Sequence, residues 1–132
     1  MQPEGAKALN ITVVDRLAAV IGAERVVKLI VDFGADLPNR LETLERAARS
    51  RRFDEVRKVA HDLAGASASL GLTELMERCR EIEAACEAEK WDDAQRSAVD
   101  TFRLQMRAFE ALAEAEAVAS AGGGKRRSAG IR

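Results

Sequence analysis

The chain carries its only histidine, His61, in the stretch Val59-Ala60-His61-Asp62-Leu63-Ala64-Gly65-Ala66-Ser67-Ala68-Ser69-Leu70-Gly71. A helix turns by about 100° per residue, so residues spaced three and four apart fall on one stripe, which the helix would bury. The members of this stripe are Val56, Val59, Ala60, Leu63, Ser67 and Leu70. His61 lies roughly 140° from the centre of the stripe. The sequence therefore predicts a helix that presents a single imidazole to solvent.

The expected neighbours of His61 on the exposed face are basic or small. Within two turns of the histidine they are Arg57, Lys58, Ala64, Gly65 and Ala68. Glycine inside a helix costs about 1 kcal/mol relative to alanine, so Gly65 needs a reason to be there. A residue without a Cβ atom, one turn from the imidazole, lets another protein approach the histidine closely.

Apolar residues recur at helical spacing along most of the chain, and almost no segment alternates with the period of a strand. We expect a short helix near residues 10–21 that Asn10 or Thr12 caps and Gly22 ends. A long helix follows over about residues 23–48, and Pro38 interrupts its apolar stripe without shifting the phase. The spacing predicts one long helix with a kink rather than two separate helices.

Three further helices are predicted in the second half of the chain. Asp54 is the expected N-cap of the histidine helix, which Gly71 ends, and another helix runs near residues 73–89. Trp91 lies at the turn into a last helix, where we expect it to plug the end of the bundle. The expected buried stripe of that last helix consists of Val99, Phe102, Met106, Phe109 and Ala113.

These helices predict an all-α domain. Four long amphipathic helices joined by short connections favour an antiparallel up-down four-helix bundle, with the short extra N-terminal helix as a lid. We expect residues 1–9 to be a flexible N-terminus, residues 10–118 to form the bundle and residues 119–132 to be a flexible basic tail.

The composition argues against several classes of protein. No apolar run has transmembrane length and no secretory signal is visible, so we expect a cytoplasmic protein. The 21 basic and 22 acidic residues nearly cancel, which gives no bias toward nucleic acid or membrane. The sequence has no glycine-rich nucleotide loop, no distinct pair of catalytic carboxylates and no metal-ligand cluster. We therefore expect neither an enzyme activity of its own nor a bound cofactor.

Cys79 and Cys86 are expected to be buried core residues. Seven helical residues separate them by about 10.5 Å of rise, whereas the Cα atoms of a disulfide lie within about 7 Å of each other. With no histidine nearby, the two cysteines also make a poor zinc site.

The residues around the histidine resemble the motif of the histidine phosphotransfer (HPt) family of two-component phosphorelays. The matching positions are His61, Leu63, Gly65, Ala66, Ser67, Leu70 and Gly71. The resemblance continues downstream through Leu75, Cys79, Ile82 and Glu83, and upstream through residues 33–48, so it covers roughly residues 10–115. The family has a lysine three residues after its histidine, where this chain has Ala64.

The resemblance implies that His61 is a phosphoacceptor, and Nε2 is its expected accepting atom because Nδ1 lies closer to the helix backbone. Arg57 or Lys58 would offset the roughly two negative charges of the phosphoryl group, which is the role of the lysine in the family. The implied partners are a response-regulator receiver domain, whose aspartate and bound Mg²⁺ complete the transfer, and a sensor histidine kinase. The contact would be small and transient, near or below about 1,200 Å². Its docking surface would consist of Ala64, Gly65 and Ala68.

Three interpretations stay open. We favour a free-standing phosphorelay intermediate, because Met1 begins the chain and no kinase or receiver motif accompanies the bundle. The chain is alternatively the N-terminal phosphoacceptor domain of a chemotaxis-type kinase. A third interpretation, for which Ala64 argues, is a helical adaptor that regulates a receiver or kinase without being phosphorylated. We expect a monomer, since no kinase dimerisation helix is visible.

Overall fold

The computed structural model describes the backbone of residues 8–131 and the side chains of residues 8–122. Over the described backbone the chain is helical, with short connections and no strand, so the prediction of an all-α fold is confirmed. The elements are α1 (Ile11–Ile21), α2 (Ala23–Arg49), α3 (Phe53–Ser69), α4 (Thr73–Glu87), α5 (Trp91–Asp100), the 3₁₀ turn η1 (Thr101–Leu104) and α6 (Gln105–Ile131).

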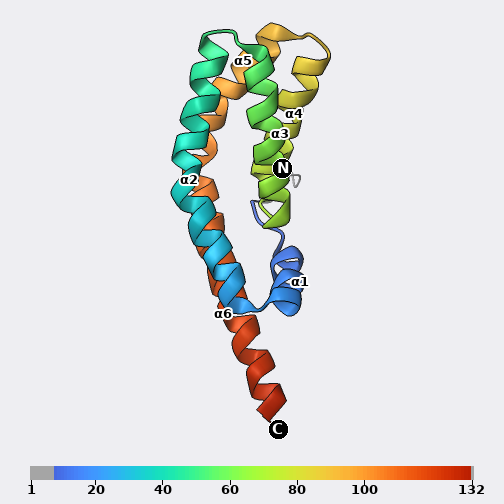
Figure 1. The fold of residues 1–132 in the computed structure, drawn as a ribbon, viewed down its shortest axis with the longest axis vertical. Helices are drawn as coiled ribbons and strands as arrows, with labels where there is room; N and C mark the ends of the chain where they lie inside the picture. The colour runs from blue at the N-terminus through green and yellow to red at the C-terminus, as the bar shows by residue number, and fades with distance from the viewer. Residues whose placement is uncertain (1–7, 132) are drawn as a thin grey trace, which may run out of the picture.

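The helices pack side by side around one apolar core (Figure 1). Helix α3 packs against α4, and α2 packs against α6, while α5 and η1 lead into α6 and contact both α2 and α4. Figure 1 shows that α2 and α3 run in opposite directions, as do α3 and α4. The largest fully buried side chains of the core are Leu37, Leu41, Leu44, Leu63, Leu72 and Ile82.

Helix α2 is one continuous helix that contains Pro38, as the sequence predicted. Its buried face carries Val26, Ile30, Leu37, Leu41 and Leu44, which belong to the predicted stripe. Pro38 itself is exposed. A proline in a helix interior removes one backbone hydrogen bond, and packing of the apolar face on both sides of Pro38 keeps the helix together.

Helix α1 is joined to the turn between α3 and α4. The Asn10 side chain accepts a hydrogen bond from the backbone N–H of Thr12, at 3.1 Å, and so caps α1 as predicted. The Asn10 backbone N–H donates to the carbonyl of Gly71, at 2.7 Å. Gly71 has a φ of +75°, and a Cβ atom at this position would lie 2.7 Å from the carbonyl oxygen of Asn10. Gly71 is therefore required both by its left-handed backbone and by the approach of α1.

The start of α3 differs from the prediction. The helix begins at Phe53, and Arg52 occupies the N-cap position without a side-chain hydrogen bond, so Asp54 is not the N-cap. Asp54 lies instead in the first turn, where a negative charge interacts favourably with the helix dipole. The helix therefore begins two residues earlier than predicted, and its first residue, Phe53, stacks on Trp91 with 4.9 Å between ring centroids. Trp91 thus packs at the end of the bundle where the α2–α3 turn meets α5.

The predicted buried stripe of the last helix is wrong. Phe102 and Met106 are 50% and 68% exposed, Ala113 is exposed, and Val99 and Phe109 are only partly buried. The buried residues of η1 and α6 are instead Thr101, Leu104, Ala108, Ala111, Leu112, Ala115 and Ala119. Most of these side chains are small, and small side chains let α6 lie close to α2. The prediction was based on the larger apolar residues, which lie on a different face of the helix from the residues that are buried.

Helix α6 also continues beyond the predicted end of the bundle. Its backbone is helical to Ile131, and Ala119, the first residue of the predicted flexible tail, is fully buried. The tail prediction is therefore wrong at its start, because the alanine face of α6 still packs at Ala119. The side chains of residues 123–132 and the segment 1–7 lie outside the described part of the chain, so the division into domains stays a prediction.

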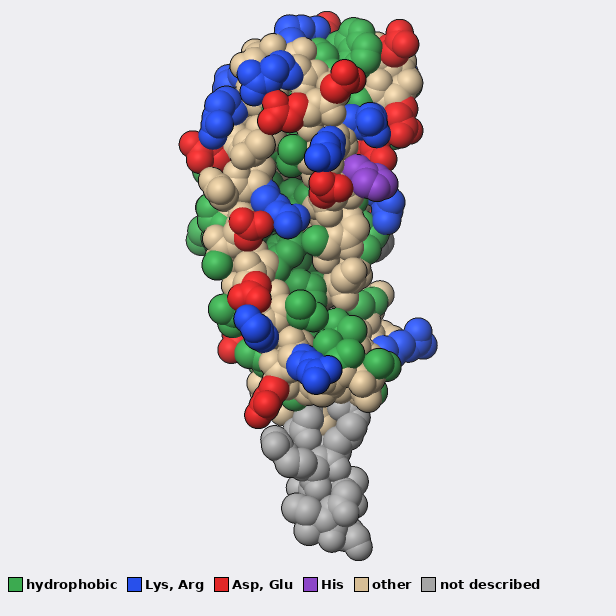
Figure 2. Space-filling model, in the orientation of Figure 1, with side chains coloured by type: hydrophobic (Ala, Val, Ile, Leu, Met, Phe, Trp, Pro, Cys, Tyr) green, Lys and Arg blue, Asp and Glu red, His purple; other side chains and the backbone are tan. Residues whose placement is uncertain are grey.

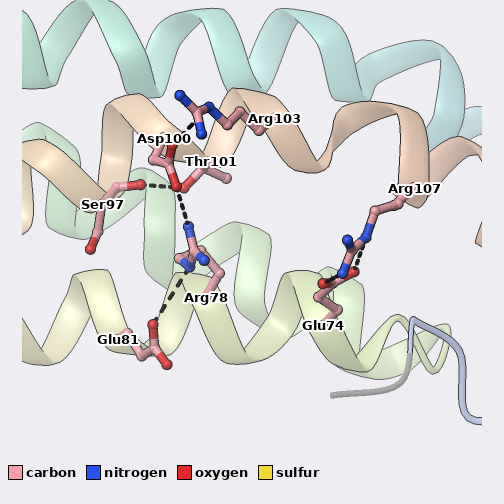
Figure 3. Close-up of polar contacts among 8 residues, drawn as sticks. All are labelled: Glu74, Arg78, Glu81, Ser97, Asp100, Thr101, Arg103 and Arg107. Carbon is pink, nitrogen blue, oxygen red and sulfur yellow. Dashed lines mark hydrogen bonds and ion pairs between the residues drawn. The ribbon is translucent and has the colours of Figure 1, made fainter. Parts of the chain in front are cut away.

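Two ion pairs join α4 to the helical segment that follows it (Figure 3). Arg78 of α4 contacts Asp100 at the end of α5, with 3.3 Å between Nη1 and Oδ2, and Glu74 pairs with Arg107 of α6. Near Asp100, the buried Thr101 hydroxyl donates to the Ser97 carbonyl at 2.7 Å. These contacts hold one side of α4 against α5 and α6, and leave its other side to face α3.

Candidate functional site

His61 lies on the surface of α3 at the boundary with α4. Its side chain is 63% exposed, and it is the purple residue in Figure 2. The imidazole Nδ1 lies 2.8 Å from Oε2 of Glu83, which α4 contributes. Glu83 is only 16% exposed, so its carboxylate is held between the two helices while the outer part of the imidazole faces solvent. The prediction that His61 is exposed is confirmed.

The contact with Glu83 determines which nitrogen of a neutral His61 is free. An ionised carboxylate can only accept hydrogen bonds, so Nδ1 must carry the proton and donate it to Glu83. In a neutral imidazole, Nε2 then has no hydrogen and offers a lone pair to solvent. The same carboxylate fixes the orientation of the ring. The site is therefore one exposed imidazole whose ring a carboxylate orients from behind.

The charges around Cys86 agree with antiparallel packing of α3 and α4. Burial raises the pKa of the Cys86 thiol on α4, and the positive charge of Arg57 on α3 lowers it in part. Arg57 precedes His61 by one turn on α3, and Cys86 follows Glu83, the partner of His61, by three residues on α4. Residues that come earlier on α3 therefore lie opposite residues that come later on α4, as expected for antiparallel helices. Arg80 lies three residues before Glu83 on α4, so antiparallel packing puts it at the level of the residues that follow His61 on α3.

Three basic residues lie within one turn of His61 or of its partner Glu83. Arg57 and Lys58 lie one turn before His61 on α3 and are both exposed, as the sequence predicted, and Arg80 is exposed on α4. Among the residues with described side chains, none of the three forms an ion pair. Figure 2 shows basic side chains on more than one side of the histidine. Their positive charge is therefore available to an anion bound at Nε2.

The three small residues of the predicted docking surface differ in exposure. Gly65 is exposed, and a Cβ atom there would have no atom within 4 Å, so packing within the chain does not require glycine. Ala68 is half-buried. Ala64 is only 1% exposed and belongs to the core cluster. The expectation that Ala64 belongs to an open docking surface is therefore wrong, whereas Gly65 and Ala68 remain accessible.

Sequence reasoning did not assign roles to Glu83 and Arg80. Glu83 was noted as part of the family resemblance, but it lies 22 residues from His61 along the chain. The alignment of two helices is not determined by the apolar spacing within each of them. One feature of the sequence could have identified Glu83: it is an acidic residue directly after Ile82, which belongs to the buried stripe of α4.

The two cysteines are core residues without catalytic character, as predicted. Both are buried and neither forms a disulfide. Burial raises the pKa of the Cys79 thiol to about 12, which keeps it protonated at neutral pH. Among the described residues, no cluster of three or more histidine, cysteine or acidic side chains has the arrangement of a metal site.

The fold and this site define a class of protein: a small helical domain with one exposed imidazole that a carboxylate orients. Consistent with that class, the family model of the Hpt domain matches residues 28–118, more than two thirds of the chain. The chain belongs to the Hpt domain family, whose members carry phosphoryl groups in two-component signalling. No curated protein and no solved structure matches it. Among the helices described, none has the length and hydropathy needed to cross a membrane.

Proposed function

We propose that this chain is a histidine phosphotransfer protein that accepts a phosphoryl group on Nε2 of His61. The donor is a histidine kinase or the phosphorylated aspartate of a receiver domain, and the acceptor is a response regulator. The observation that carries this proposal is the 2.8 Å contact between His61 and Glu83, which leaves Nε2 as the exposed nucleophile. In this proposal the antiparallel up-down four-helix bundle of the family keeps the two residues aligned.

The transfer step balances without a further catalytic residue in this chain. The Nε2 lone pair attacks the phosphorus atom of the donor, a new N–P bond forms, and the bond that joins phosphorus to the donor breaks. That bond is O–P in a receiver phosphoaspartate and N–P in a kinase phosphohistidine, and its electron pair returns to the leaving oxygen or nitrogen. His61 becomes positively charged while Nδ1 keeps its proton, and the Glu83 carboxylate stabilises this charge through the existing hydrogen bond. Positioning and electrostatics dominate such reactions, so the partner protein supplies the remaining groups, including Mg²⁺.

Arg57, Lys58 and Arg80 are the candidates for neutralising the phosphoryl group. The family lysine that usually has this role is replaced by Ala64. A long side chain at the buried position 64 would have to extend between α3 and α4 to reach the phosphoryl group. Arg80 is exposed on the facing helix α4, and we infer that it takes the place of the lysine. Arg57 and Lys58 add positive charge from the other side of His61.

We further infer that a receiver domain docks over Gly65 and Ala68, and that the exchange takes place in the cytoplasm. The absence of a Cβ atom at the exposed position 65 allows the active-site loop of the partner to approach Nε2. The chain itself acts as a carrier, and the partner completes the reaction.

The proposal is tested by transfer of labelled phosphate from a phosphorylated kinase or receiver of the same cell. We expect acid-labile label on the wild-type chain and none on His61→Gln. Glu83→Ala keeps the histidine but removes the group that orients it, and we expect the transfer rate to fall about tenfold or more, as when a carboxylate behind a metal-bound histidine is removed.

A regulatory adaptor would behave differently in the same assay. It would take up no label from any cognate donor, and His61→Gln would leave its effect on the partner unchanged. That result would contradict phosphotransfer by this chain while leaving the membership in the family intact.

A further inference from the structure

An apolar stripe runs along the outer side of α5, η1 and α6. It consists of Val99, Phe102, Met106, Phe109 and Ala113, which follow one another at intervals of three, four, three and four residues. This is the spacing of a coiled-coil seam. Phe102 and Met106 are 50% and 68% exposed, although apolar side chains of this size are usually buried. Val99 and Phe109 are partly buried against the core, so the part of the stripe that is exposed on the described surface consists of Phe102, Met106 and Ala113.

Charged residues beside the stripe indicate which partner fits it. Arg103 and Glu110 are both exposed and lie on the same edge, seven residues apart, with Met106 between them. The contact of Arg103 with Asp100 of the same chain involves an arginine side chain that is 85% exposed, so the guanidinium can reorient at little cost. Glu110 forms no ion pair with any residue whose side chain is described.

We propose that this stripe is a homodimer interface, in which α6 of a second copy packs antiparallel around Met106. A two-fold axis at Met106 brings Arg103 of each copy opposite Glu110 of the other, so two pairs of opposite charges line the same edge of the seam. A parallel pair would not bring these residues together. The antiparallel arrangement also places the small Ala113 of one copy near the larger Val99 and Phe102 of the other. The stripe is thus complementary to itself in shape and in charge.

The surface next to the stripe offers room for the second helix. A groove of about 820 Å³ between α2 and α5 borders the stripe at Val99 and Phe102. Its walls carry both acidic and basic side chains, among them Glu45, Arg49 and Arg96. Helix α6 of the second copy would cover the exposed Phe102 and reach the rim of this groove.

The proposed dimer leaves His61 accessible. His61 lies where α3 meets α4, whereas the stripe lies on the α5–α6 segment beside α2. Figure 1 shows the α3–α4 pair and the α2–α6 pair on different sides of the molecule. Dimerisation and phosphotransfer are therefore separable, and the failure of one proposal does not affect the other. The sequence alone led us to expect a monomer.

Sedimentation equilibrium of the full chain tests the proposal. At about 100 μM, a dimer with a Kd of about 1 μM is almost fully formed, so we expect a mass twice the 14.3 kDa of the monomer. Met106→Glu places two like charges at the centre of the seam, and we expect its Kd to rise at least about tenfold. Val20→Glu is the matched control, because Val20 is 81% exposed on α1, away from the stripe.

Charge reversal tests the antiparallel geometry. Arg103→Glu or Glu110→Arg alone should weaken the dimer several-fold, and the double variant should restore it, because each pair regains opposite charges. Circular dichroism verifies that every variant is folded. The proposal is overturned if the wild-type chain sediments as a monomer, if Met106→Glu dimerises as well as Val20→Glu, or if the double charge reversal is weaker than both single ones.

Discussion

His61 and Glu83 are 22 residues apart in the chain, but in the fold Nδ1 of His61 lies 2.8 Å from Oε2 of Glu83. The exposure of His61 and of Gly65 followed from the rotation of one helix, so the sequence was sufficient to predict it. The burial of Ala64 did not follow, because position 64 lies between the core side and the outer side of α3, and the packing of α4 decides such a position. The orientation of the imidazole depends on the same packing.

The residue Gly65 lends itself to a test that separates stability from function. Gly65→Ala adds a Cβ atom that meets no atom within 4 Å, so we expect the free energy of unfolding to rise by about 0.5–1 kcal/mol. The same methyl group lies where the partner approaches His61, so we expect phosphotransfer to slow by about tenfold or more. Urea unfolding and the labelled-phosphate assay measure the two effects.

Gly34→Ala is the control for this variant. Gly34 also lies inside a helix, and its Cβ atom would be 3.4 Å from Leu112 in the core, away from His61. Its transfer rate should equal that of the wild type. A normal rate for Gly65→Ala would show that the partner does not need the open space above residue 65.

The residue Arg80 is expected to contribute to the stability of the phosphohistidine. Removing one positive charge close to a phosphoryl group changes its free energy by about 1 kcal/mol in a partly solvated site. We therefore expect Arg80→Ala to lower the equilibrium fraction of phosphorylated His61 several-fold. Higher salt should reduce the difference between the variant and the wild type, because exposed charges are screened.

The same equilibrium fraction is measured for Arg57→Ala and Lys58→Ala. The control is Arg96→Ala, which removes a surface arginine of α5. If Arg80→Ala behaves like Arg96→Ala while Arg57→Ala or Lys58→Ala loses phosphorylation, the charge comes from α3 instead, as the sequence first suggested.

Among the elements, the helices that begin or end at glycine or asparagine were the best predicted. Asn10, Gly22 and Gly71 lie at the ends that the sequence assigned to them, because their roles depend on local backbone geometry. The face of α6 was not predictable in the same way. Its apolar residues form two stripes, one of large and one of small side chains, and only the neighbouring helices determine which stripe is buried.

The connection between α1 and the α3–α4 turn predicts a strong effect of Gly71→Ala. The change strains a residue with a φ of +75° and forces the carbonyl of Asn10 away from a Cβ atom 2.7 Å distant. We expect a loss of about 2–4 kcal/mol in the free energy of unfolding, which urea titration measures. Hydrogen exchange should also show loss of protection at the Asn10 amide, which donates to Gly71.

Gly22→Ala separates the effect of backbone strain from the effect of the close contact between residue 71 and Asn10. Gly22 has a φ of +93°, but its Cβ atom would meet nothing within 4 Å. It should destabilise the chain through backbone strain and leave the Asn10 amide protected. Equal loss of protection in both variants would contradict a specific role of Gly71 in holding α1.

At the scale of the whole molecule, the buried Cys79 links stability to pH. Its pKa rises from 9.0 in the unfolded chain to about 12 in the fold, so above pH 9 the unfolded chain loses a proton that the folded chain keeps. The contribution of Cys79 to the free energy of unfolding is therefore fully present below pH 9. Between pH 9 and about 12 the free energy of unfolding falls by up to about 1.4 kcal/mol per pH unit. Unfolding titrations from pH 7 to 10.5 measure this slope.

The variant Cys79→Ala verifies the origin of the slope. It is less stable at every pH because it leaves a small cavity, but its stability should fall less steeply above pH 9. The chain has no tyrosine whose ionisation could produce a similar slope. An unchanged slope in the variant would assign the effect to other groups.

The stacking of Trp91 on Phe53 gives the molecule a built-in optical probe. The chain has one tryptophan and no tyrosine, so its fluorescence reports only on the end of the bundle where the α2–α3 turn meets α5. Helix α1 lies at the other end (Figure 1). Detachment of α1 would therefore change the circular dichroism signal but not the emission of Trp91. Melting curves that coincide for the two signals would mean that both ends of the molecule unfold as one cooperative unit.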